Sequence, residues 1–302
     1  MRRAPIKILL FYDMEGASGV VDDATMNPEK PDAFAKGRQS LIDEVNAVIA
    51  GLFDGGATIV EVKNAHGYGG DSLVPRDRLD QRARITSDPR LLPYNPADGL
   101  SEFGYHAVVT VAMHDKPLSG GFSPHTLGAG ISPIFNGAAA TETELVGYAY
   151  GTAGIPVIFA SGDDQLQRTL GAVMPWVEYV TVKRIVAPTV PVALPAEEVR
   201  RELQTKAARA VRGLEEPGRM RVMRLTAPFR AGFLPTYPRL LLPGVGNIPG
   251  LERHGDTVTF LAKDYRSAYL GFFALQRISL AFYRERILNE LSSRCRPGQA
   301  NH

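Results

Sequence analysis

Two acidic residues, Asp13 and Glu15, follow an apolar run near the start of the chain, in the stretch FYDMEGASG. Only Met14 separates them, and side chains two positions apart in an extended segment point the same way, so we expect the two carboxylates to converge. Converging carboxylates repel each other, and protons, a basic side chain or a cation must neutralise them. The pattern therefore indicates a charged site directly after the first predicted strand.

Three further candidate ligands follow other predicted strands: His66 in VKNAHGYGG, His114 in VVTVAMHD and Glu142 in IFNGAAATETEL. In an open parallel sheet, ligands bind outside the carboxyl ends of the strands, so we expect these side chains to share one edge with the first two. A catalytic zinc ion takes three ligands from the protein, and five ligands suit two metal ions about 3.5–4 Å apart. Nitrogen and oxygen ligands without a thiolate favour zinc and admit manganese or cobalt.

Each of these residues also has an ordinary structural explanation. A carboxylate at a strand end is often a helix cap or a turn former, and a single histidine is more often a satisfied polar residue than a ligand. Glu142 is the weakest candidate, because Glu144 follows two residues later and either carboxylate favours the first turn of a helix. The metal prediction rests on convergence of all five residues at one edge.

A sixth residue, His125, lies in the glycine-rich stretch SGGFSPHTLGAG. A histidine on such a loop over a metal crevice is a candidate proton shuttle, base or nucleophile, and a water-exposed loop histidine is the alternative. The stretch Gly162–Asp164 predicts a helix cap, with orientation of a metal ligand as a less favoured role. We exclude His106, because it begins a strand at the opposite edge of the predicted sheet. We also exclude His254 and His302.

Strand-like and helix-like runs alternate in the first half of the chain, which predicts an α/β fold with an open, mostly parallel sheet covered by helices. Asp32 is expected to cap a helix that ends at Gly55. Further helices are expected at about Thr141–Tyr150 and Asp164–Met174. The predicted strands are Ile6–Tyr12, Thr58–Val62, Ala107–Met113, Pro133–Phe135, Val157–Ala160 and Val177–Val182.

The composition changes at Pro188, where APTVPVALPAEEV is rich in proline. We expect a catalytic α/β domain over residues 1–187 and a smaller α+β domain over 188–302 that contributes to packing and oligomerisation. The second domain is expected to hold a helix at about Ala196–Leu214, strands near Met220–Leu225 and Thr257–Phe260, and a long closing helix from about Asp264. The wide apolar arc of that last helix favours burial against the first domain or a subunit interface.

The composition excludes several classes of protein. The chain has 302 residues, 44% hydrophobic and 22% charged, which is ordinary for a globular enzyme. Its net charge of +2 comes from scattered basic residues, so nucleic acid is not an expected partner. No run approaches the roughly 18 apolar residues of a membrane span. A single cysteine, Cys295, fits a reducing cytoplasm.

With these residues identified, the chain resembles the D-aminopeptidase family, a cytoplasmic class of dinuclear zinc peptidases. DMEGASG, NAH, MHDKPLSGGFSPHT and NGAAATE look like the ordered site motifs of that family, and PVIFASGDD looks like the strand that follows them. The stretches FRAGFLP and FLAKDYRSAYLGFFAL look like its C-terminal half. Five motifs in order are far more specific than any one of them.

The resemblance implies a role for each site residue. Asp13 would bridge two zinc ions and Glu15 would bind one of them. His66, His114 and Glu142 would complete the metal ligands. His125 takes the position of the family's catalytic histidine, as nucleophile or general base.

The resemblance also implies an activity and an assembly. Family members remove N-terminal D-amino acids from short peptides and form ring-shaped homo-oligomers whose sites face an interior channel. The chain departs from the family at Lys63-Asn64-Ala65-His66, where Asn-Asp-Ser-His or a similar sequence is usual, and this puts the orientation of His66 and the substrate preference in question.

Two other functions are compatible with the same residues. One is a non-catalytic ring protein that holds a peptide or metabolite in the crevice. The other is a dinuclear amidohydrolase or phosphoesterase, in which HGYGG approaches an anion. The preference for a D- or an L-residue and the length of the peptide stay open at this stage.

Overall fold

The computed structural model describes residues 5–67, 73–128, 130–236 and 248–294; Cys295 and His302 lie outside them. The chain forms two compact units. The first contains Met1–Leu127 and Ala140–Leu225, and the second contains Gly128–Ala139 and Thr226–His302. Each unit has its own sheet.

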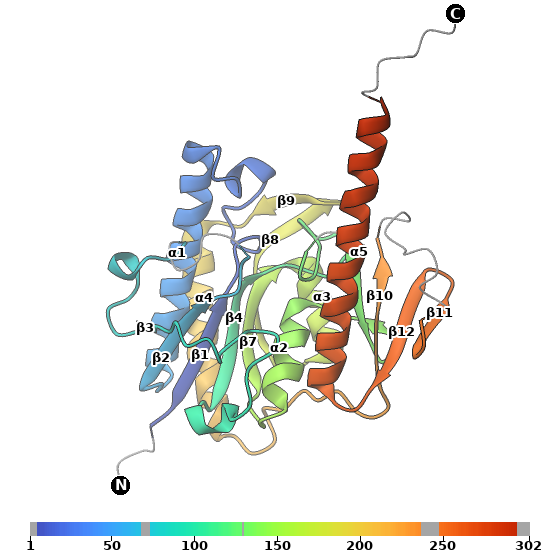
Figure 1. Cartoon of the computed structure of the whole chain (residues 1–302). Coiled ribbons are helices and arrows are strands. Elements are labelled where there is room, and N and C mark those ends of the chain that lie inside the picture. The colour runs from blue at the N-terminus through green and yellow to red at the C-terminus, as the bar shows by residue number, and fades with distance from the viewer. Residues whose placement is uncertain (1–4, 68–72, 129, 237–247, 295–302) are drawn as a thin grey trace, which may run out of the picture. The chain divides into compact units, whose positions relative to one another are not determined.

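The first unit is built on a seven-stranded sheet in the order β3-β2-β1-β4-β7-β8-β9 (Figure 1). All neighbouring strands run parallel except β9, which pairs antiparallel with β8. This confirms the predicted α/β class with a mostly parallel sheet. The strands are β1 (Lys7–Tyr12), β2 (Ile59–Asn64), β3 (Arg84–Ile85), β4 (Ala107–Met113), β7 (Val157–Asp163), β8 (Glu178–Ala187) and β9 (Val190–Ala193).

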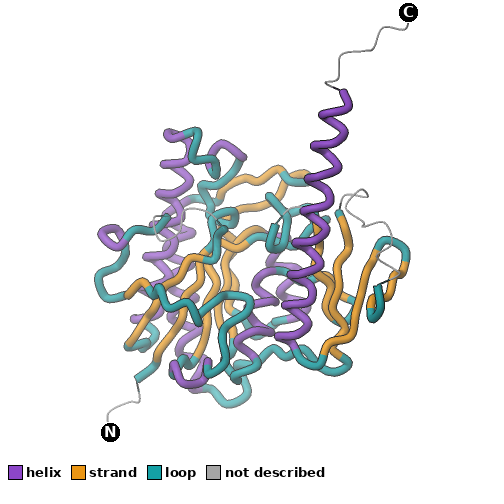
Figure 2. Tube along the Cα trace, in the orientation of Figure 1, coloured by secondary structure: helices purple, strands orange, loops and turns teal. Residues whose placement is uncertain are grey.

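Helices cover both faces of this sheet, and side chains of β1 are buried alternately against one face and the other. Ile8 and Leu10 belong to the core shared with α1 (Pro31–Asp54) and α4 (Ala196–Arg212). Phe11, the residue after Leu10, points to the other face, where its ring packs edge-to-face with Tyr150 on α2 (Glu142–Gly151), with centroids 5.5 Å apart. The period-2 alternation of a strand thus buries β1 on both sides. Figure 2 shows the helices and strands along the chain.

Two of the predicted helices begin at well-defined caps. At the start of α2, Thr141 and Glu144 form a capping box in which each side chain accepts the other's backbone N–H. At the start of α3 (Asp164–Val173), the Asp163 side chain accepts the N–H groups of Gln165 and Leu166, so the predicted helix cap is confirmed. Both helices therefore begin at the expected residues.

The second unit has a five-stranded antiparallel sheet in the order β11-β12-β10-β5-β6. Helix α5 (Tyr265–Arg294) packs on β10, β12 and β5. The strands are β5 (Ile131–Phe135), β6 (Ala138–Ala139), β10 (Phe229–Pro235), β11 (Leu251–His254) and β12 (Thr257–Ala262). The combination of one antiparallel sheet and a long helix matches the expected smaller α+β unit.

Three details differ from the expectations. The strand predicted at Pro133–Phe135 belongs to the antiparallel sheet and not to the parallel one, so Glu142 follows no strand of the parallel sheet. The strand expected near Met220–Leu225 is wrong, because that segment has no strand. The boundary expected at Pro188 falls between β8 and β9, which hydrogen-bond to each other within the first unit.

Among the described residues, we find no helix whose length and apolarity would suit a membrane crossing.

Candidate metal centre

The first two carboxylates lie on a tight loop that follows β1. The backbone N–H of Asp13 donates to the carbonyl of Val111 at 2.9 Å, and that of Gly16 donates to the carbonyl of Ala112 at 2.8 Å. The loop approaches β4 so closely that a Cβ on Gly16 would lie 2.0 Å from the Met113 oxygen, which only glycine permits. The segment is therefore a turn pressed against the neighbouring strand end, and not the extended segment that the sequence suggested.

Both carboxylates nevertheless converge on the histidine that follows β2. His66 Nδ1 lies 2.9 Å from Asp13 Oδ1 and 3.1 Å from Glu15 Oε2. The carboxylates are buried, and the backbone N–H of His66 donates to Asn64 Oδ1 at 2.8 Å. Asn64 thus orients the backbone at the position where the chain departs from the usual family motif. Asp13, Glu15 and His66 form a first group with ligand atoms within 4.8 Å of one another.

A second group lies at the end of β4 and the start of α2. It contains His114, His125 and Glu142, again with ligand atoms within 4.8 Å of one another. The two imidazole rings stack, with centroids 3.9 Å apart. His125 Nδ1 lies 2.8 Å from the carbonyl oxygen of Ser123. The glycine-rich loop therefore places His125 directly beside a candidate ligand.

The two groups meet at Asp13. Its Oδ1 faces His66 in the first group, and its Oδ2 lies 3.4 Å from His114 Nε2 in the second. Glu142 Oε1 lies 3.6 Å from the same nitrogen. The structure thus brings together all five predicted ligands and His125, in an arrangement with Asp13 between two histidines.

The geometry of His114 fits a metal ligand. Its Nδ1 lies 3.1 Å from the carbonyl oxygen of Asp115, to which it donates in the neutral ring, so that Nε2 carries the lone pair. That Nε2 is fully buried, has no hydrogen-bond partner, and faces the oxygens of Asp13 and Glu142 at distances longer than a hydrogen bond. A buried nitrogen left unpaired costs free energy, and a cation among these atoms would satisfy it.

The carboxylates of the site raise the pKa of the two histidines that lie among them. Burial acts to lower the pKa of His66, but hydrogen bonds to Asp13 and Glu15 outweigh it and raise the pKa to about 10. For His114, burial again acts to lower the pKa, and the nearby negative charges of Glu142 and Asp13 raise it to about 10. Both shifts have the same cause, which is the negative charge gathered around the two imidazoles.

The two carboxylates that face His114 respond in opposite directions. Burial acts to raise the pKa of Asp13, but the two neighbouring imidazoles, His114 beside Oδ2 and His66 hydrogen-bonded to Oδ1, hold it well below its ordinary value. Burial dominates at Glu142 and raises its pKa, although the charge of His114 opposes this. The two histidines therefore favour the ionised form of Asp13, whereas burial favours the neutral form of Glu142.

Two residues that contact the site carried no signal in the sequence. Tyr94 lies in a stretch between β3 and β4, and its phenol donates a hydrogen bond to Glu142 Oε2. Lys183 lies on β8, where its position in an apolar strand gave no reason to connect it with residues 13–20. Only the folded chain brings either residue to the site.

Lys183 organises the loop after β1. Its ammonium group is buried, lies 4.5 Å from the ring centroid of Phe122, and donates to three backbone carbonyls: Glu15, Ala17 at 3.1 Å and Val20 at 2.7 Å. Burial lowers its pKa to about 8, against the attraction of nearby carboxylates. The three N–H groups of one ammonium thus fix the backbone that carries the first two carboxylates.

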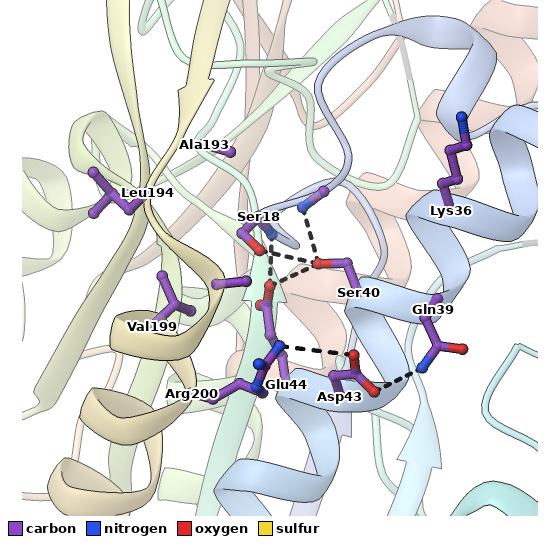
Figure 3. A pocket seen from close by; sticks show the side chains of 12 residues that line it. Ser18, Lys36, Gln39, Ser40, Asp43, Glu44, Ala193, Leu194, Val199 and Arg200 are labelled. Atoms are coloured by element: carbon purple, nitrogen blue, oxygen red, sulfur yellow. Dashed lines mark hydrogen bonds and ion pairs between the residues drawn. The ribbon is translucent and has the colours of Figure 1, made fainter.

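A cavity of about 280 Å³ lies beside the far end of this loop. Figure 3 shows Ser18 and Ser40 hydrogen-bonded to each other there, with Glu44 accepting the backbone N–H of Ser18 at 2.7 Å. Its walls are formed by Ser18 and Gly19, by helix α1, by the end of β9 and by the first turns of α4. None of the six candidate site residues lines this cavity.

Comparisons with known proteins agree with this picture. The model of the D-aminopeptidase family matches residues 6–273 of the chain. The D-aminopeptidase of Bacillus subtilis (strain 168) is 25% identical over 279 residues, which cover 91% of this chain and 98% of that protein. Among solved structures, the Zn-dependent D-aminopeptidase DppA from Bacillus subtilis, described as a self-compartmentalizing protease, is similar in fold with a TM-score of 0.78. It shares 24% identity over 91% of this chain and 98% of that one.

Proposed function

Because the chain belongs to the D-aminopeptidase family, we propose that it is a metal-dependent aminopeptidase that removes the N-terminal residue, a D-amino acid, from short peptides. The observation that carries this proposal is the position of Asp13, whose two oxygens face one histidine from each candidate group. A carboxylate so placed suits a bridge between two metal ions. Zinc is the metal named for the similar solved structure, and the nitrogen and oxygen donors suit it.

In this proposal the ligands are divided between two positions. Glu15 and His66 would hold one ion, His114 and Glu142 would hold the other, and Asp13 would be shared between them. When bound, such a pair polarises the scissile carbonyl and lowers the pKa of water from about 15.7 toward about 7.

Hydrogen bonds within the protein orient the rings of His114 and His125, and His125 is the residue that moves the proton. Donation from His125 Nδ1 to the carbonyl of Ser123 leaves Nε2 as the atom that takes a proton from the attacking group and returns it to the leaving amine. The carbonyl of Asp115 accepts the backbone N–H of His125 at 3.1 Å and faces the Nδ1 atom of His114, so one peptide group positions both rings. Whether His125 acts as base or as nucleophile, this tautomer presents the same nitrogen.

The assembly and location are part of the same proposal. We expect a homo-oligomer, ring-shaped as in the family, in the cytoplasm. The self-compartmentalizing protease DppA supports the assembly, and the mass of the particle in solution tests it.

One experiment tests the activity. The purified protein is loaded with zinc and given matched peptides that differ only in a D- or an L-residue at the N-terminus, with and without a chelator. We expect release of the free D-amino acid that the chelator abolishes. Hydrolysis of phosphate esters without peptide cleavage would favour the phosphoesterase, and tight peptide binding without hydrolysis would favour the binding protein.

A further inference from the structure

Glu142 is held by the protein at both of its carboxylate oxygens. The phenol of Tyr94 donates to Oε2, and the backbone N–H of Leu127 donates to Oε1 at 2.8 Å. Tyr94 is buried, with 8% of its surface exposed, so water does not compete freely for this hydrogen bond. Two segments distant in sequence therefore fix the rotation of one carboxylate.

The two oxygens are not equivalent with respect to the candidate metal position. Oε1 is the oxygen that lies 3.6 Å from His114 Nε2. Oε2 is the oxygen bound by the phenol. Oε1 accepts the N–H of Leu127 and has a second lone pair available beside His114, whereas Oε2 is the oxygen that the buried phenol occupies, so the arrangement favours binding through Oε1 alone over binding through both oxygens.

We propose that Tyr94 is a positioning residue that makes Glu142 a one-oxygen metal ligand through Oε1. This inference rests on the proposed metal pair and adds a specific role for the loop after β3. Binding through one oxygen keeps the coordination number of the ion at His114 low, and a low number leaves room for substrate. Tyr94 acts on the reaction through Glu142 and has no assigned contact with the reacting atoms.

The loop that carries Tyr94 has other attachments. The Tyr150 phenol donates to the carbonyl of Leu92 at 3.2 Å, and the backbone N–H of Ala97 donates to the carbonyl of Arg90 at 2.9 Å. Leu91 is buried. The loop therefore keeps its place when the Tyr94 hydroxyl is removed, and Tyr150→Phe is a matched control that removes a phenol hydrogen bond to the same loop without touching Glu142.

The test uses cobalt as a spectroscopic probe in the full-length protein. Wild type, Tyr94→Phe and Tyr150→Phe are stripped of metal and titrated with Co²⁺, and the visible absorption and dissociation constants are recorded. In Tyr94→Phe, Oε2 is free to join the coordination, so we expect weaker visible bands, because cobalt absorbs less strongly at higher coordination number. We also expect one dissociation constant to rise about 10- to 100-fold. Tyr150→Phe should match wild type.

The outcomes separate this inference from the proposed function. If wild type binds no Co²⁺, both fail. If wild type binds Co²⁺ and Tyr94→Phe has the same spectrum and affinities, the role of Tyr94 fails while the metal centre stands. The same holds if Tyr150→Phe reproduces the change, because loosening of the loop would then explain it.

A second comparison keeps the inference testable if Tyr94→Phe is poorly stable. In the Glu142→Gln background, Tyr94→Phe should leave the cobalt spectrum unchanged, since the carboxylate through which Tyr94 acts is absent. A spectral change of the same size in that background would overturn the inference.

Discussion

The imidazole rings of His114 and His125 stack nearly parallel, with centroids 3.9 Å and planes 12° apart. His114 has its Nε2 among carboxylate oxygens, whereas His125 is placed by the loop that follows β4. The stacking holds a candidate proton carrier next to a candidate ligand. The two roles can be separated by experiment, because loss of a proton carrier lowers turnover and loss of a ligand lowers metal content.

Replacing His125 by Ala should lower turnover by about 100- to 10,000-fold, the usual contribution of a general acid or base. Metal content by elemental analysis should stay at the wild-type value. His106→Ala is the control, since His106 accepts a hydrogen bond from the backbone of Lys7 away from the site. A loss of bound metal in His125→Ala would show that His125 is a ligand instead, and full turnover would exclude both roles.

Asp13→Asn should lower metal occupancy at both positions, because the amide has only one oxygen and no negative charge to share between cations. The measurement is elemental analysis after dialysis, with circular dichroism to confirm the fold. Asp23→Asn, on an exposed carboxylate, is the control. Retention of the full metal content in Asp13→Asn would contradict the bridging role.

Lys183→Met should destabilise the protein by on the order of 3 kcal/mol, because the buried carbonyls of Glu15 and Val20 lose their donor. Urea unfolding measures the loss. Lys36→Met, on an exposed lysine, should change stability by less than about 0.5 kcal/mol. Equal stability of the two variants would show that the loop keeps its shape without the ammonium.

Glu44→Gln should change how stability depends on pH. Burial raises the pKa of Glu44 above its ordinary value of 4.5, against hydrogen bonds from Ser18 and Ser40. A carboxyl whose pKa is higher in the folded state favours folding fully below pH 4.5, and this contribution is lost as the pH rises toward the folded pKa. The free energy of unfolding of wild type minus that of Glu44→Gln should therefore fall as the pH rises from about 4 to 7.

Unfolding in urea at several pH values checks this slope. Glu29→Gln is a suitable control, because Glu29 is exposed. A difference that is flat or rises with pH would contradict the effect of burial at Glu44.

Most of what could be predicted about the site follows from the rule that ligands bind outside the carboxyl ends of parallel strands. It placed Asp13, His66 and His114 correctly at one edge, because β1, β2 and β4 are adjacent parallel strands. Glu142 joins them for a different reason, at the capped start of α2 after a chain excursion into the second unit. Their roles as ligands stay a prediction.

The two site residues that the sequence did not reveal come from segments that lie far along the chain from the residues they contact. Tyr94 reaches the site through one hydrogen bond to Glu142, and Lys183 reaches it through three hydrogen bonds to backbone carbonyls of the loop after β1. Hydrophobic periodicity reports which face of an element is buried, and it says nothing about which polar atom a buried side chain meets. The segment Met220–Leu225 forms no strand, and its Met223 lies against Gly147 and Gly151 of α2 instead.

The close approach of Gly16 to the end of β4 has a consequence for biosynthesis. The first carboxylate loop takes its shape only against a strand that begins more than ninety residues later in the sequence. A nascent polypeptide emerging from the ribosome with β1 and β2 alone lacks that surface. The carboxylate loop that we propose as half of the metal centre would therefore take its final shape only after β4 has been synthesised.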